Sequence, residues 1–188
     1  MNFQIWKRVS TETVSKNPIW EYRQDHIRAE DGSERDYYYV RTGGGVCVFP
    51  INRNGKVALV RQYRYLFDRV SLEPAGGQCN PELSFADSAR AELEQETGLN
   101  AEYIERIGSI APWAAVSDEE MHVFVAYGLS SAYATPDEYE ECMVVEMTPE
   151  EIEGAIERGE MFNGFAIAAC VIAKPHLLSI IDQEQAKR

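Results

Sequence analysis

The chain has 188 residues, of which 45% are hydrophobic, and its 31 acidic and 18 basic residues give a formal net charge of -13 at pH 7. This length suits one domain, or one domain with a small appendage, that buries roughly two thirds of its unfolded surface. Because affinity for nucleic acids depends on Lys and Arg, the charge argues against a nucleic-acid partner but allows a small phosphorylated substrate held by a bound cation.

Strands are predicted over much of the chain before residue 76. Their ranges are 19–28, 36–41, 46–51 and 56–65. The turn signal at 29–33 joins the first two, and the Asn-Arg-Asn-Gly turn at 52–55 joins the last two. The N-terminal half is therefore predicted to be rich in β-structure.

A glycine-rich turn at Gly76 and Gly77 then leads into a helix that is predicted to begin near Ser84 or Phe85. This helix places Glu92 and Glu96 one turn apart on one face, with Gln95 alongside. Hard cations such as Mg²⁺ or Mn²⁺ take oxygen ligands and keep waters and substrate phosphates in the remaining positions. The pair therefore predicts either a divalent metal site or an ordinary solvated acidic face.

After this helix, strands are predicted at 103–110, 121–129 and 142–147. Thr148 and Glu151 form a capping box that opens the next helix. The last helical region begins at Asn163 or Gly164 and should be kinked or divided at Pro175. Its apolar run, 165–173, is too short to span a bilayer and is predicted to be a buried helix, so no membrane partner is expected.

Strands on both sides of one glycine-turn-helix unit, with helices at the end, predict an α+β fold in which a mixed sheet packs between helices. The four cysteines form no CxxC pair, and the N-terminus lacks the pattern of a secretory signal. Both observations are typical of a protein in the reducing cytoplasm.

The segment from Gly77 to Leu99 resembles the Nudix box. That signature is a glycine, five residues, a glutamate, seven residues, and then Arg-Glu-aliphatic-x-Glu-Glu-x-Gly-aliphatic. The matching positions, in register and without a gap, are Gly77, Glu92, Leu93, Glu96, Gly98 and Leu99. The resemblance implies the Nudix α/β/α sandwich, with Gly76, Glu92, Gln95 and Glu96 as metal ligands and Glu92 and Glu96 as catalytic residues; Gly76 would contribute its carbonyl.

Three box positions depart from the family pattern. Leu83 and Ala91 replace a supporting glutamate and arginine, so neither partner is left as an unpaired charge. Gln95 replaces the first of the paired glutamates; its amide oxygen can still coordinate a cation but brings no negative charge. A site that needs several metal ions should be weakened.

Other segments resemble the subfamily that hydrolyses ADP-ribose and related nucleotide sugars. They are the Val-Arg-Gln-Tyr-Arg strand at 60–64, the Leu-Glu-Pro-Ala-Gly-Gly entry at 72–77, the Asn-Pro-Ile-Trp segment at 17–20, Pro112 and the closing element at 156–163. This likeness implies a small N-terminal sheet at residues 1–42 that takes part in homodimerisation, ahead of a Nudix domain at 43–188.

The same likeness implies substrate contacts at Arg64, Arg61, Trp20 and Glu73. Arg61 and Arg64 are three residues apart on a strand and should point to opposite faces, so at most one is expected to reach the substrate. Arg64 is favoured as a phosphate contact, with a structural ion pair as the alternative. Trp20 could stack on a base or serve as a core or dimer contact.

The subfamily also takes a catalytic base from a later loop. The acidic loop 135–141 lies where that loop is expected, and it offers Glu138 and Glu140. The alternative is a solvated charge run.

The resulting hypothesis is a Mg²⁺- or Mn²⁺-dependent pyrophosphatase. It would split ADP-ribose or a related nucleoside diphosphate sugar into a mononucleotide and a sugar phosphate. Two alternatives stay open: a catalytically impaired nucleotide-binding or regulatory protein, and an enzyme of the GDP-mannose type.

Overall fold

A computed structural model describes residues 3–132 and 142–186 of the chain. The chain divides into two compact units, Met1–Gly44 with Trp113–Glu119, and Gly45–Pro112 with Glu120–Arg188. Each unit is described by itself.

The first unit is a three-stranded antiparallel sheet in the order β1-β2-β3. Its strands are β1 (Trp6–Lys16), β2 (Glu21–Ala29) and β3 (Glu34–Arg41). The predicted turn between β2 and β3 is confirmed, because the Ala29 N–H donates to the Ser33 carbonyl at 2.9 Å. The segment 113–119 joins this sheet, where the Val40 N–H donates to the Val116 carbonyl at 2.8 Å.

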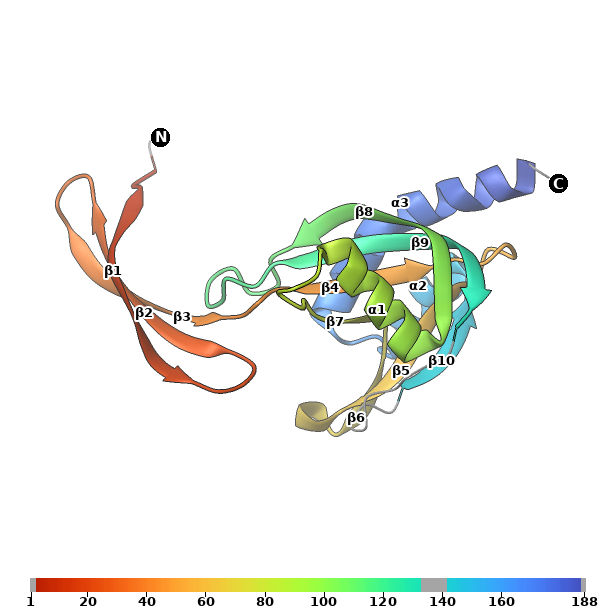
Figure 1. Cartoon of the computed structure of the whole chain (residues 1–188), viewed down its shortest axis with the longest axis horizontal. Helices are drawn as coiled ribbons and strands as arrows, with labels where there is room; N and C mark the ends of the chain where they lie inside the picture. The colour runs from red at the N-terminus through yellow and green to blue at the C-terminus, as the bar shows by residue number, and fades with distance from the viewer. Residues whose placement is uncertain (1–2, 133–141, 187–188) are drawn as a thin grey trace. The chain divides into compact units, whose positions relative to one another are not determined.

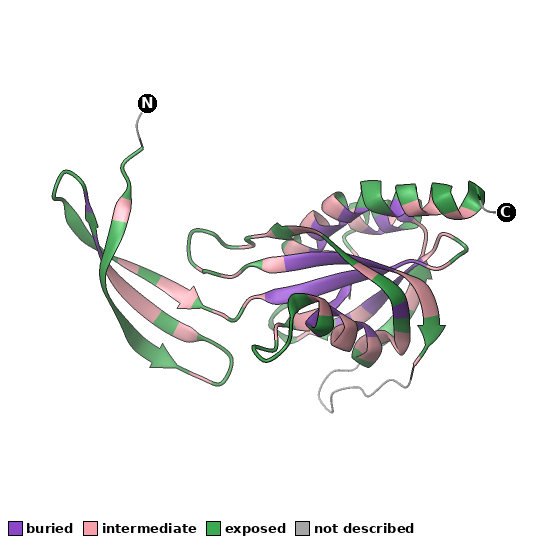
Figure 2. Ribbon diagram, turned by 45° about the horizontal axis from the view of Figure 1, so that its top comes forward, coloured by how far each residue is buried: buried purple, intermediate pink, exposed green. Residues whose placement is uncertain are grey.

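This sheet buries very little apolar surface. Among the described hydrophobic residues of the unit, only Ile27 and Ala29 are buried. Tyr22 and Tyr38 stack with ring centroids 6.2 Å apart, yet both remain exposed. Figure 2 shows the unit almost entirely in the colours of exposed and intermediate residues.

The second unit contains two sheets and three helices. Its strands are β4 (Gly45–Pro50), β5 (Val57–Arg64), β6 (Arg69–Glu73), β7 (Ala75–Gln78), β8 (Leu99–Ile110), β9 (Met121–Ser131) and β10 (Cys142–Met147), and a 3-10 turn, η1, spans Tyr65–Phe67. Its helices are α1 (Phe85–Thr97), α2 (Pro149–Glu157) and α3 (Gly164–Ala186).

One sheet has the order β7-β4-β9-β8 and is mixed, because β4 and β9 are parallel while the other neighbours are antiparallel. The second sheet has the order β10-β5-β6 and is antiparallel. The predicted turn at 52–55 is confirmed, with the Gly55 N–H donating to the Asn52 carbonyl at 3.0 Å. The strands that it joins, β4 and β5, belong to different sheets.

Alternate residues of β4 face two different apolar cores. Val46 and Val48 pack in a cluster with Leu93 of α1, whereas Cys47 and Phe49 pack in a second cluster that contains buried residues of α2 and α3. The mixed sheet therefore lies between α1 on one face and α3 on the other (Figure 1). This confirms the predicted α+β fold and its sandwich of helices around a mixed sheet.

The helix that follows Thr148 begins as its sequence predicts. The Thr148 side chain accepts from the Glu151 N–H at 3.3 Å, and the Glu151 carboxylate accepts from the Thr148 N–H at 2.8 Å. The capping box is therefore complete at the start of α2.

Several predicted elements are corrected by the structure. The Gly76 and Gly77 turn is strand β7, which pairs with β4, and the strands β1 and β6 were not predicted. Pro175 does not divide the last helix, because α3 runs unbroken over 23 residues.

Helix α3 is long and apolar enough to cross a membrane by length and composition alone, with a mean hydropathy of 1.8 in its most apolar window. Only 28% of that window is buried, so the run 165–173 is one part of a partly exposed helix rather than a fully buried one. Both membrane spans and core helices have this composition. Here the buried residues Ala166, Ala169, Cys170, Ala173 and Leu177 pack against the sheet.

Candidate active site

Helix α1 carries the predicted metal site and has well-formed ends. The Ser84 side chain caps its N-terminus by accepting from the Asp87 N–H at 3.1 Å. Gly98 ends it with a left-handed φ of 65°, a conformation that favours glycine. Ala89 and Leu93 anchor the helix in the core, and the successive turns between these ends set the positions of Glu92 and Glu96.

The two carboxylates meet the backbone of β7. The Glu96 Oε2 accepts a hydrogen bond from the Gly76 N–H at 3.0 Å. A Cβ atom added at Gly77 would lie 2.6 Å from the Glu92 Oε1, so that carboxylate occupies the space beside the glycine. Glu92 and Glu96 are therefore brought together against Gly76 and Gly77.

This donor set fits one hard cation that keeps part of its coordination shell for water and phosphate. It consists of the Glu92 and Glu96 carboxylates with the backbone of Gly76 beside them. Within residues 3–132 and 142–186, no group of three or more His, Cys, Asp or Glu residues is placed to hold a metal. A closed structural metal site is thus not formed by these side chains.

The predicted ligand Gln95 lies on the exposed side of α1, whereas Glu92 and Glu96 are half-buried. Leu83, which replaces the first glutamate of the box, is 44% exposed in the turn before the helix. Cys79 packs against the apolar cluster that contains Leu93, and burial together with the negative charge of Glu92 raises the pKa of its thiol.

Arg64 forms the ion pair that the sequence left as an alternative to a phosphate contact. Its Nε donates to the Glu73 Oε1 at 2.8 Å and its Nη2 donates to the Glu73 Oε2 at 2.6 Å. The guanidinium therefore binds the carboxylate in a bidentate manner, through two parallel hydrogen bonds. The Glu73 side chain is 6% exposed and that of Arg64 is 40% exposed. The pair is therefore anchored at its buried end and open to solvent at the other.

Asn163 adds a third hydrogen bond to this carboxylate, from its Nδ2 to the Glu73 Oε2 at 2.8 Å. Burial by itself would raise the pKa of Glu73. The hydrogen bonds and charge of Arg64, aided by the bond from Asn163, outweigh that effect and hold the pKa of this carboxyl below its ordinary value. Glu73 is thus an anion in the folded protein at neutral pH.

Arg61 has a different partner. Its Nη2 donates to the Glu160 Oε2 at 2.7 Å, and Arg158 donates to the other oxygen of the same carboxylate at 2.8 Å. Two arginines lower the pKa of Glu160. Both Arg61 and Arg64 are thus engaged with acidic side chains.

Trp20 lies in the first unit, in the turn between β1 and β2, where it is 40% exposed. The predicted catalytic bases Glu138 and Glu140 lie outside the described residues.

Sequence reasoning assigned no role to Asn163 or Glu160, although it noted the segment that contains them. Asn163 lies 90 positions from Glu73 and Glu160 lies 99 positions from Arg61. No local spacing could join such residues. No local signal marked Glu73 as a buried acceptor either, because strand β6 was not predicted and the burial that makes this carboxylate require donors follows from the completed fold.

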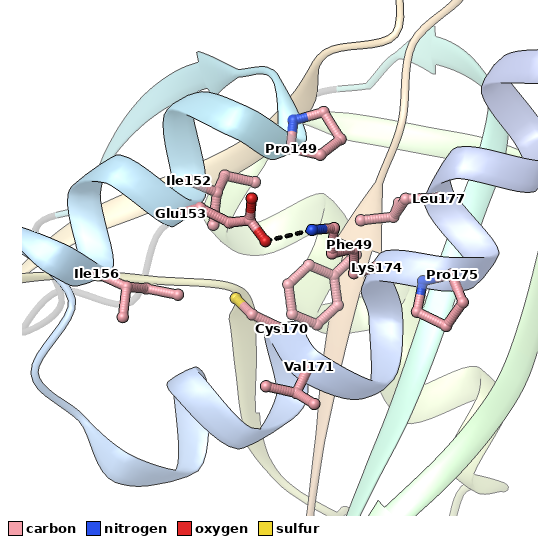
Figure 3. Close-up of a pocket in the computed structure, with 10 residues that line it drawn as sticks. All are labelled: Phe49, Pro149, Ile152, Glu153, Ile156, Cys170, Val171, Lys174, Pro175 and Leu177. Carbon is pink, nitrogen blue, oxygen red and sulfur yellow. Dashed lines mark hydrogen bonds and ion pairs between the residues drawn. The ribbon is translucent and has the colours of Figure 1, made fainter.

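A separate cavity of about 270 Å³ opens between α2 and α3 (Figure 3). Phe49, Ile152, Cys170 and Leu177 supply much of its apolar lining, and Lys174 forms an ion pair with Glu153 across it. Phe49 belongs to the core cluster on the α3 side of the sheet, whereas α1 packs in the other cluster. This cavity lacks the paired carboxylates and glycine backbone of the candidate site.

Comparisons with known proteins agree with this geometry. A model of the NUDIX domain matches residues 41–165. The chain is 28% identical to the methanol dehydrogenase activator of Bacillus methanolicus over 165 residues, which cover 87% of this chain and 89% of that protein. It is 27% identical to the ADP-ribose pyrophosphatase of Bacillus subtilis (strain 168) over 164 residues, which cover 84% and 89% of the two chains.

A solved structure of an ADP compounds hydrolase shares the fold. It superposes with a TM-score of 0.83 over 95% of this chain and 97% of that one, at 19% sequence identity. The resemblance extends beyond the matched domain, because the coverage of this chain is nearly complete.

Proposed function

The chain belongs to the Nudix family, and on that premise we propose that it hydrolyses the diphosphate bond of ADP-ribose or a related nucleoside diphosphate sugar. The products would be a mononucleotide and a sugar phosphate. The observation that carries the proposal is the pair of carboxylates, Glu92 and Glu96, packed against the glycine backbone of β7. The name of the Bacillus subtilis relative supports the choice of substrate class.

Glu92, Glu96 and the carbonyl of Gly76 would hold Mg²⁺ or Mn²⁺. When bound, such a cation neutralises charge on phosphate oxygens and lowers the pKa of a coordinated water. The hydrogen bond from the Gly76 N–H fixes the direction of the Glu96 carboxylate before any ligand arrives. Preorganisation of this kind reduces the cost of ordering the site on binding.

Arg64 would contact the diphosphate. Its guanidinium is fixed by Glu73 and keeps 40% of its side-chain surface open to solvent. A planar guanidinium suits phosphate oxygens, and anchoring by Glu73 restricts its orientation. The base that activates water is proposed to be Glu138 or Glu140, from the acidic loop that follows β9.

We further propose that the first unit mediates a homodimer. Its three strands bury only Ile27 and Ala29 among the described hydrophobic residues of that unit. A sheet of this kind usually needs a covering partner for stability. A second copy of the same chain would supply it.

The central experiment is hydrolysis of a panel of nucleotide sugars, including ADP-ribose and GDP-mannose, with magnesium present and release of mononucleotide as the readout. The Glu96→Gln variant keeps an oxygen that can accept from Gly76 but loses the charge. We expect its turnover to fall by roughly 100-fold, the scale of several kcal/mol of lost charge stabilisation, with its melting temperature little changed.

Glu94→Gln is the matched control, because it removes a carboxylate from the same helix. Glu94 lies two residues from Glu92 and therefore projects from a different face of α1. Its rate should equal that of the wild type. If Glu96→Gln keeps the full magnesium-dependent rate, the site has been assigned wrongly.

A regulatory or nucleotide-binding role is the second candidate, favoured by Gln95 in place of a glutamate and by the relative named as a methanol dehydrogenase activator. Binding of nucleotides without release of mononucleotide from any member of the panel would favour this role over the enzyme.

A further inference from the structure

The segment between α2 and α3 is fastened to the hairpin of β5 and β6. The Leu72 N–H donates to the Glu160 carbonyl at 2.9 Å, and the Arg61 side chain binds the Glu160 carboxylate. Phe162 is held beside the same hairpin, with the guanidinium carbon of Arg69 3.5 Å from its ring centroid. Glu160 and Phe162 therefore hold the chain against this hairpin directly before Asn163, at the start of α3.

Asn163 uses the two ends of its amide for different contacts. Its Oδ1 accepts from the Phe165 N–H at 3.0 Å, which caps the first turn of α3. Its Nδ2 donates to the Glu73 Oε2 at 2.8 Å. The cap fixes the orientation of the amide, so the NH₂ group is aimed at Glu73 by the start of the helix.

The same Oε2 atom of Glu73 also accepts from Arg64, whose two bonds require both carboxylate oxygens to lie in the plane of its guanidinium. A buried carboxylate with three donors has little freedom to rotate. Removing the Asn163 donor would leave the orientation of Glu73 to a side-chain hydrogen bond from Ser71 and to Arg64, whose side chain is partly exposed.

We propose that Asn163 is a positioning residue for the substrate: it fixes the Glu73 carboxylate, which in turn holds the Arg64 guanidinium in the orientation that meets a diphosphate. This inference rests on the proposed function. It assigns to the start of α3 a part in substrate affinity, in addition to its part in folding.

Substitution can separate the two roles of Asn163. Serine and aspartate cap helices about as well as asparagine, so the bond to Phe165 survives in both variants. In Asn163→Ser the hydroxyl is too short to reach Glu73, and only the donor is lost. We expect the KM for ADP-ribose to rise about tenfold, which corresponds to about 1.4 kcal/mol, close to the scale of one hydrogen bond to a charged group, with a smaller change in kcat.

Asn163→Asp places a second carboxylate beside Glu73. At pH 8 the two anions repel, so KM relative to the wild type should rise more than in Asn163→Ser. Towards pH 5 the two carboxyls can share a proton, which restores a hydrogen-bond donor between them. The KM of Asn163→Asp divided by that of the wild type should therefore fall again. A residue that only caps the helix would give no such pH profile.

Thr148→Ala is the matched control, because it removes the cap of α2 and has no contact with Glu73. It should lower the melting temperature and leave KM unchanged. An unchanged KM in a normally folded Asn163→Ser protein would overturn the inference, and so would an equal rise in KM in Thr148→Ala.

The proposed function can fail separately, if the wild type hydrolyses no member of the panel. The positioning role is then decided by the pKa of Glu73, measured from its side-chain ¹³C shift. Loss of the Asn163 donor should raise that pKa in Asn163→Ser, and an unchanged value would overturn the inference.

Discussion

At the scale of single residues, Gly76 and Gly77 are neighbours in β7 with different constraints. A Cβ atom at Gly76 would lie 2.3 Å from the Val46 carbonyl oxygen and 2.8 Å from the Cys47 Cα, which are fixed backbone atoms of β4. At Gly77 its three nearest atoms would be the carboxylate carbon and oxygens of the Glu92 side chain, which can move. Gly76 therefore serves the packing of β7 against β4 as well as the site, through its hydrogen bond to Glu96, whereas Gly77 leaves room for the Glu92 carboxylate.

The two alanine variants should consequently differ. Gly76→Ala is expected to lower the free energy of unfolding by about 1–3 kcal/mol, as overpacking does when backbone must shift. Gly77→Ala should fold with nearly normal stability but lose activity, because Glu92 is displaced. Denaturant unfolding and ADP-ribose hydrolysis measure the two effects, and an active Gly77→Ala protein would show that the position of Glu92 does not matter.

The site shows which residues a sequence can reveal. Glu92 and Glu96 were predicted together because helical periodicity alone puts them on one face. The pairing of Arg64 with Glu73 was foreseen only as an unspecified ion pair. Asn163 could not be found, since its bond to Glu73 joins α3 to β6 across 90 residues and depends on the completed fold.

At the scale of elements, α3 contains a proline that its sequence predicts should interrupt it. Pro175 lacks the N–H that would bond to the carbonyl of residue 171, yet the helix continues. Val171 is 70% exposed, so this turn of the helix faces solvent and water can satisfy the carbonyl. The buried residues on both sides of Pro175 hold the helix together.

Replacing this proline should stabilise the protein. Pro175→Ala restores one helical hydrogen bond and removes the clash of the ring, while the unfolded chain gains entropy. We expect the free energy of unfolding to rise by about 1–2 kcal/mol, measured by denaturant titration. A decrease would mean that the Pro175 ring, which lines the cavity between α2 and α3, contributes more by packing.

The elements that were predicted correctly have strong local signals, as in the capping box at Thr148 and the turn at 52–55. The missed strands lack such signals. β1 is mostly polar and exposed on both sides, so it shows no apolar alternation. β7 contains two glycines and is a strand because β4 provides its hydrogen bonds, which no local pattern reports.

At the scale of the whole molecule, the two units differ in how much core they contain. The second unit has two apolar clusters on the two faces of a mixed sheet. The first has exposed aromatic side chains at Trp20, Tyr22 and Tyr38 instead. A three-stranded sheet that buries so little apolar area gains little stability by itself. This is the physical argument that a second copy of the chain covers it.

If the first unit mediates the proposed homodimer, introducing charge into this sheet should dissociate that dimer. The double variant Tyr22→Lys with Tyr38→Lys breaks the stacked pair and puts like charges on the face that a second copy would cover. Sedimentation velocity should show a dimer for the wild type and a monomer for the variant. Val171→Lys is the control, because Val171 is an exposed apolar residue of the other unit, and it should remain dimeric. Dissociation by Val171→Lys, with the double variant intact, would place the interface on α3 instead of the N-terminal sheet.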